Sequence, residues 1–146
     1  MFADFLRRLG APDPETVPQP DARRALTALL VRLARADNHY APAERTRIEA
    51  IAMRRYGLDA AAATALREEG EALEAEAPDT VRFTRAIKDK VAYEDRIEVV
   101  EALWELALAD GDRAEEEDAL LRLVTSLLGI SDTDSAMARQ RVAARE

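Results

Sequence analysis

The strongest constraint on the fold of this chain is a recurring helical spacing of its apolar residues. Leu26, Leu29, Leu30 and Leu33 lie three and four positions apart, which places them on one face of an α-helix. Three later segments show comparable spacing at these apolar positions: Ile48, Ile51, Ala52 and Tyr56; Ile97, Val100, Leu103, Trp104 and Ala107; Leu120, Leu121, Val124, Leu127 and Leu128. Ala, Leu, Arg and Glu dominate the composition while β-branched residues are scarce, which favours helices over sheets.

The pattern predicts an all-α fold, a single compact bundle of seven to eight helices. We expect Pro42 in the first turn of one helix and Gly57 at its end, because proline suits the first turn and glycine the terminus. Asp59 is expected to cap an exposed acidic helix, and Ser131 with Asp134 to cap the last one. The predicted core includes these residues: Leu30, Leu33, Ile51, Trp104, Leu106 and Leu121.

The 146 residues have the size of one ordinary domain. Residues 1–20 are predicted to form a short amphipathic helix and a connector, because residues 11–20 hold four of the six prolines and cannot continue a helix. Residues 21–146 are predicted to form the all-helical domain.

Charge and residue usage limit the kinds of partner and the cellular location that we expect. The net charge is −8, so a phosphate backbone would be repelled and nucleic acid is not expected as a partner. The chain has no cysteine, which removes disulfides and thiolate metal sites and fits a reducing compartment, so a cytoplasmic location is expected. No window approaches the roughly 18 apolar residues of a membrane span, so no direct membrane insertion is expected.

Two acidic segments share one spacing. In ARADNHYAPAE, residues 34–44, Glu44 follows Asp37 by seven positions, and in ALADGDRAEEE, residues 107–117, Glu117 follows Asp110 by seven. Predicted helices flank each segment, and a glycine ends the second helix in both cases. The chain is therefore predicted to contain an internal helix–loop–helix repeat.

Asp37, Glu44, Asp110 and Glu117 are candidate ligands of a divalent metal, Ca²⁺, Mg²⁺ or Zn²⁺. The aspartates follow helix C-termini, where the helix dipole disfavours a carboxylate, and a hard cation would offset that cost with several oxygen ligands. Helix capping is the competing interpretation, because acidic residues in a first helical turn are favourable without a metal. His39 is the only histidine, and we interpret it as a surface residue.

The sequence contains no motif that indicates an enzyme. It has no nucleophile elbow, no Gly-rich phosphate loop and no His-Glu-x-x-His pair. We therefore expect a non-enzymatic protein. Two hypotheses stay open: a metal-binding stress module, or a protein-interaction adaptor that docks through its acidic helix or the N-terminal FADFLRRL segment while the acidic loops only cap helices.

The two acidic segments, together with RFTRAI and ALWELALADG, resemble the TerB-like tellurite-resistance family from about Asp21 to Val142. The resemblance implies a small all-helical domain with a role in stress resistance, acidic loops proposed to bind a divalent metal, and a protein partner in a stress-response complex. The family pattern is an Ala-Asp-Gly turn followed by a glutamate seven residues after the aspartate. The second segment matches this pattern, whereas the first has Asn38 in place of the glycine.

Overall fold

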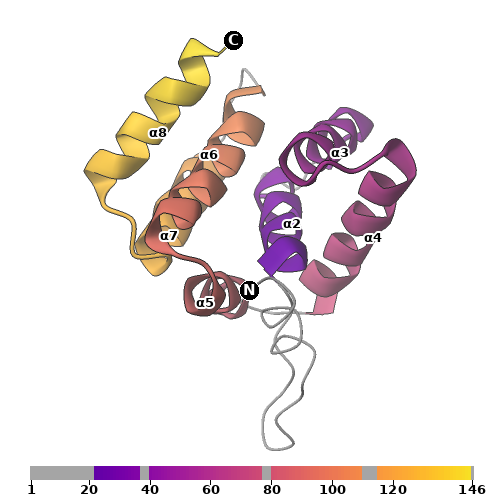
Figure 1. Cartoon of the computed structure of the whole chain (residues 1–146), viewed down its shortest axis with the longest axis horizontal. Coiled ribbons are helices and arrows are strands. Elements are labelled where there is room, and N and C mark those ends of the chain that lie inside the picture. The colour runs from indigo at the N-terminus through magenta and orange to yellow at the C-terminus, as the bar shows by residue number, and fades with distance from the viewer. Residues whose placement is uncertain (1–21, 37–39, 77–79, 110–114, 146) are drawn as a thin grey trace, which may run out of the picture.

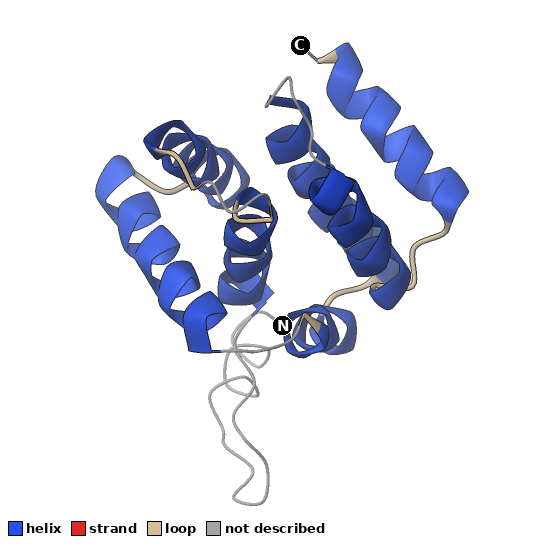
Figure 2. Cartoon of the chain, turned by 180° about the vertical axis from the view of Figure 1, so that it is seen from behind, coloured by secondary structure: helices blue, strands red, loops and turns tan. Residues whose placement is uncertain are grey.

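The computed structural model describes residues 22–36, 40–76, 80–109 and 115–145. Within these ranges the chain forms seven α-helices and no strand, joined by short connections (Figures 1 and 2). In chain order the helices are α2 (Ala22–Ala34), α3 (Pro42–Tyr56), α4 (Ala60–Glu76), α5 (Val81–Lys90), α6 (Tyr93–Ala109), α7 (Glu115–Leu127) and α8 (Asp132–Ala144). The all-α prediction is confirmed. The predicted helix and connector of residues 1–20 lie outside the described residues, so the division at residue 21 stays a prediction.

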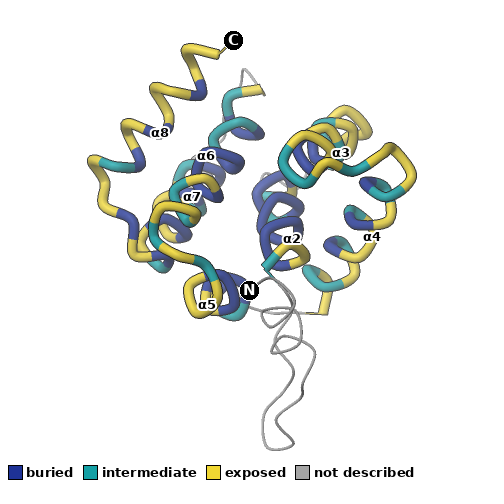
Figure 3. The backbone as a smooth tube through the Cα atoms, viewed as in Figure 1, coloured by how far each residue is buried: buried dark blue, intermediate teal, exposed yellow. Residues whose placement is uncertain are grey.

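Helix α2 lies at the centre of the fold. It packs most closely against α4 and also contacts α3, α5, α6 and α7. Nine of its thirteen residues are buried, so it needs apolar side chains on nearly every face (Figure 3). Helices α3 and α4 lie on one side of α2, whereas α6, α7 and α8 lie on the other, with α5 near one end (Figure 1). The first acidic segment joins α2 to α3 and the second joins α6 to α7; the internal repeat itself stays a prediction.

The core joins both sides of the molecule around α2. Five of the six predicted core residues are buried: Leu30, Leu33, Ile51, Leu106 and Leu121. Trp104 differs, because it is only partly buried and packs against the core from its edge. Its Nε1–H donates to Ser135 Oγ at 3.2 Å, and the Arg139 guanidinium lies 5.2 Å from its ring centroid. An indole carries a donor that needs a partner, which the polar edge of the core supplies.

Helix α4 is less exposed than its acidic sequence predicts. Ala63, Leu66 and Gly70 form a buried face that packs on α2 and α3. The Glu74 side chain is only 12% exposed, and its carboxylate oxygens lie 3.6 Å from Arg32 Nε and 3.5 Å from Arg35 NH1. The solvated face predicted for this segment therefore holds for only part of it, because arginines at the end of α2 reach its acidic side chains.

The helix ends follow the expected chemistry. Gly57 ends α3 with φ of 63°, in the left-handed region that costs glycine least. Asp59 Oδ1 accepts the Ala62 N–H at 2.8 Å, and Ser131 Oγ accepts the Asp134 N–H at 3.1 Å, as predicted for two N-caps. No helix in the described ranges has the length and apolar character needed to cross a membrane.

Candidate functional site

The predicted metal ligands fall partly outside the described structure. Asp37 and Asp110 lie outside the described residues, and so does His39, which we interpret as a surface residue. Glu44 is the third residue of α3, and its Oε1 accepts the N–H of Ala41 at 3.2 Å, so it caps this helix as the competing interpretation expects. Glu44 also makes a further interaction within the chain, so capping does not describe its whole environment.

Glu117 is the third residue of α7 and is only 3% exposed. A carboxylate removed from water in this way needs charged or hydrogen-bonding groups around it, and Glu117 does interact with another group of the chain. Among the described residues, no group of three or more acidic or histidine side chains could hold a metal ion. Because Asp37 and Asp110 are not among those residues, the four-residue site stays a prediction.

Tyr40, which lies in the first acidic segment two residues before α3, is anchored to α4. The Tyr40 hydroxyl donates to Glu71 Oε2 at 2.6 Å, and Arg67 NH1 donates to the same oxygen at 2.7 Å. Arg67 also donates from Nε to Glu49 Oε2 at 2.7 Å, which ties α4 to α3. The guanidinium of Arg35 lies 5.0 Å from the Tyr40 ring centroid. This network holds α3, α4 and the exit of the loop together.

The hydrogen bonds of Tyr40 and Arg67 to Glu71 favour the ionised form of the Glu71 carboxylate. Burial and the hydrogen bond to Glu71 raise the pKa of Tyr40 above its ordinary value, so the phenol stays protonated. Burial alone would raise the pKa of Glu71, but hydrogen bonds from Tyr40 and Arg67 outweigh it and lower that pKa. The anchor is thus intact across neutral pH.

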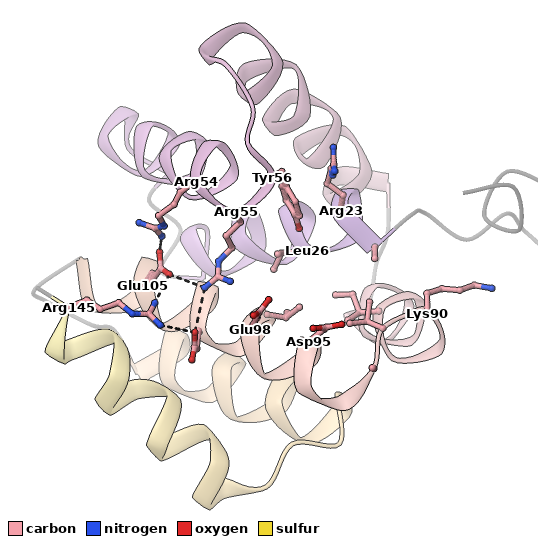
Figure 4. Close-up of a pocket in the computed structure, with 16 residues that line it drawn as sticks. Arg23, Leu26, Arg54, Arg55, Tyr56, Lys90, Asp95, Glu98, Glu105 and Arg145 are labelled. Carbon is pink, nitrogen blue, oxygen red and sulfur yellow. Dashed lines mark hydrogen bonds and ion pairs between the residues drawn. The ribbon is translucent and has the colours of Figure 1, made fainter. Parts of the chain in front are cut away.

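A cleft of about 780 Å³ opens between α2 and α3 on one side and α5, α6 and Arg145, the residue that follows α8, on the other (Figure 4). Its walls carry both signs of charge. Arg54, Arg55 and Arg145 lie at one end, and Asp95 and Glu98, near the start of α6, lie away from them. A volume of this order is typical of small-molecule sites.

Four arginines surround two glutamates at the basic end of this cleft. We call this set the arginine cluster: Arg54, Arg55, Arg141, Arg145, Glu101 and Glu105. Arg141 Nε and Arg145 NH2 donate to Glu101 at 2.8 Å and 3.2 Å. Arg55 NH2 donates to Glu105 Oε1 at 2.9 Å, and Arg54 pairs with the other Glu105 oxygen. The cluster joins α3 and α8 through α6, and several of its contacts are drawn in Figure 4.

Burial and charge act in opposite directions inside the arginine cluster. Burial would raise the pKa of Glu101, but the hydrogen bonds and charges of Arg141 and Arg145 outweigh it and lower that pKa. Burial lowers the pKa of Arg55, with Arg54 acting in the same direction and Glu101 and Glu98 opposing. Glu101 is therefore ionised at neutral pH.

Sequence reasoning missed the arginine cluster. Glu101 and Glu105 are four residues apart, as are Arg141 and Arg145, so each pair lies on one face of its helix. That spacing was a signal that the two faces could be complementary. It could not show that α6 and α8 pack together, nor that Arg54 and Arg55 would reach the same glutamates from α3.

A family model described as Tellurite resistance protein TerB matches residues 23–140. The chain belongs to the TerB family. The match spans both acidic loops and all four predicted metal ligands, and it ends one residue before Arg141. No match was found among curated proteins or among solved structures. The TerB domain therefore covers most of the described fold, while two of the four arginines of the cluster lie beyond the matched residues.

Proposed function

We propose that this tellurite-resistance-type domain is a non-enzymatic stress-response module that binds a divalent cation through its two acidic loops. Asp37 and Glu44 would supply oxygen ligands from the first loop, and Asp110 and Glu117 from the second. Membership of the TerB family supports the stress-response role. A cytoplasmic location and a protein partner in a stress-response complex are part of the same proposal.

The position of the two glutamates carries the proposal. Glu44 and Glu117 are each the third residue of the helix that follows an acidic loop. Each loop is therefore followed by a carboxylate at the equivalent position of the next helix. Glu117 is 3% exposed, and a buried carboxylate is stabilised when a cation lies beside it. Ca²⁺ and Mg²⁺ prefer such oxygen ligands, while Zn²⁺ would also accept a nearby imidazole.

The adaptor alternative receives less support from the described residues. One of its two expected docking surfaces is the acidic helix α4, but Glu71 and Glu74 of this helix pair with Arg67 and with Arg32 and Arg35. The other, the FADFLRRL segment, lies outside the described residues. Acidic groups that already pair within the chain are less able to attract a basic partner.

The test is the melting temperature of the purified chain with and without a cation. A ligand that binds only the folded state stabilises it by about 2.7 kcal/mol at a hundred times its dissociation constant. We therefore expect the melting temperature to rise with millimolar Ca²⁺, Mg²⁺, Mn²⁺ or Zn²⁺ and to fall back when a chelator is added.

The variants Asp37→Asn and Asp110→Asn keep the shape of the side chain and its capping ability while removing a charge. Each should abolish the cation-dependent shift and leave stability in chelator nearly unchanged. Asp89→Asn is the matched control, because Asp89 is exposed on α5 and is not in an acidic loop. A wild-type chain that shows no shift with any of the four cations would leave helix capping as the role of both loops.

A further inference from the structure

A second cavity lies at the outer side of the arginine cluster. It has a volume of about 510 Å³ and is formed by α3, α6, α8 and the residue that follows α8. We call it the arginine groove, and these residues line it: Arg47, Ala50, Ile51, Arg54, Glu105, Ala109, Val142 and Arg145. It shares Arg54, Glu105 and Arg145 with the larger cleft, so the groove and the cleft adjoin across these three side chains.

The groove carries an excess of positive charge. Among the described residues that line it, three carry guanidinium groups and one, Glu105, carries a carboxylate. Both oxygens of this carboxylate are already paired, one with Arg54 and the other with Arg55 at 2.9 Å. Arg47 makes no ion pair within the part of the chain that the structure describes. Neighbouring Glu101 is shared between Arg145 of the groove and Arg141, so the two carboxylates of the arginine cluster face its four arginines as well as Arg47.

This excess is notable because the chain as a whole has a net charge of −8. Guanidinium groups that outnumber the carboxylates between them repel one another, and a further anion would reduce this repulsion. The side chains of Arg54 and Arg145 are 62% and 55% exposed, so they can turn toward an occupant without unfolding the core. A guanidinium has five N–H donors, and the contacts to Glu105 use only some of them.

The remaining walls of the groove are apolar. Ala50, Ile51, Ala109 and Val142 contribute only aliphatic groups. An inorganic anion would satisfy the guanidinium groups but leave these walls against water. A ligand with an oxyanion group and a compact apolar body would use both kinds of wall.

We infer that the arginine groove binds a small organic anion whose phosphate or carboxylate group pairs with Arg47, Arg54 and Arg145 and whose apolar part packs on the aliphatic wall. Neither Glu44 nor Glu117, the two proposed metal ligands within the described residues, lines this groove, and the inference does not depend on the cation proposal.

The experiment uses the full chain in chelator at constant ionic strength, with isothermal titration and melting temperature as readouts. The probes are phenyl phosphate, inorganic phosphate and benzyl alcohol, which supply both features, the anion alone and the ring alone. We expect saturable binding of phenyl phosphate, at least tenfold weaker binding of inorganic phosphate, and no binding of benzyl alcohol. Equal affinity for both phosphates would overturn the role of the aliphatic wall.

Arg47→Gln tests the site directly, because Arg47 is outside the ion pairs of the arginine cluster and its loss should leave the fold intact. We expect a dissociation constant for phenyl phosphate raised at least tenfold, with an unchanged melting temperature in the absence of ligand. Arg122→Gln, which alters an exposed arginine of α7, is the matched control and should bind like wild type. No binding by wild type, or equal binding by Arg47→Gln, would show that the arginines only brace the helices.

Discussion

Replacing Gly70 by alanine should destabilise the domain although alanine is the better helix former. Gly70 lies in α4 against α2, and a Cβ at this position would lie 2.6 Å from Thr27 Cγ2, 3.0 Å from Thr27 Cβ and 3.1 Å from the Thr27 carbonyl carbon. The methyl group could rotate away, but the backbone carbon can move only if the two helices separate. Overpacking of this kind lowers the free energy of unfolding by about 1–3 kcal/mol, and the higher helix propensity of alanine offsets about 1 kcal/mol of that loss. We expect a net loss near 2 kcal/mol, at the upper end because backbone is involved.

Urea denaturation of the wild-type chain and the variant measures this difference. Ala72→Gly calibrates the propensity, because Ala72 is exposed on the same helix, and it should cost about 0.5–1 kcal/mol. Thr27→Ser removes the nearest methyl group while keeping the hydroxyl that donates to the Arg23 carbonyl oxygen at 2.8 Å. In that background Gly70→Ala should cost less. A stabilising Gly70→Ala, or a coupling to Thr27 within about 0.3–0.5 kcal/mol of zero, would refute the packing argument.

Three further predictions address the core, the arginine cluster and the loop anchor. Leu33→Ala removes a side chain that is 2% exposed and should cost about 2–5 kcal/mol in chemical denaturation; a loss below about 0.5 kcal/mol would place Leu33 outside the core. The pKa of Glu101 is lowered in the folded state, so its stabilising effect is full above its unfolded-state pKa of about 4.3 and is lost as pH falls through the folded value. Glu101→Gln should therefore flatten the acid side of a stability–pH profile, and an unchanged acid slope would contradict this assignment. Tyr40→Phe deletes the 2.6 Å hydrogen bond to Glu71 and should cost about 1 kcal/mol by urea denaturation, whereas a neutral change would show that water replaces the hydroxyl.

The helical character of the chain was readable from its sequence because it depends on local spacing. Apolar residues three and four positions apart define a buried face whatever the partner is, and Leu33 and Leu121 lie in the core as predicted. The helix ends were equally local: Gly57 ends α3, and Asp59 and Ser131 accept hydrogen bonds at the starts of α4 and α8. Each of these interactions involves residues at most five positions apart along the chain.

The sequence also identified the acidic loops and placed Glu44 and Glu117 in first helical turns, because position within a helix is a local property. It did not distinguish their environments. Glu117 is buried while Glu44 is only partly covered, and this difference depends on how α7 packs against α2, α5 and α6.

The contacts that set the candidate sites belong to the tertiary structure alone. Arg55 and Glu105 are fifty residues apart, and Arg141 lies forty residues from Glu101, so no local pattern brings these charges together. Gly70 is required only because α4 approaches Thr27 of α2 closely at that point. By itself, the sequence determined which residues become helical and which face of each helix is apolar, since both follow from spacing within one segment. The packing of α3, α6 and α8 decided which charges meet, because long side chains find their partners only after the apolar faces have set the positions of the helices.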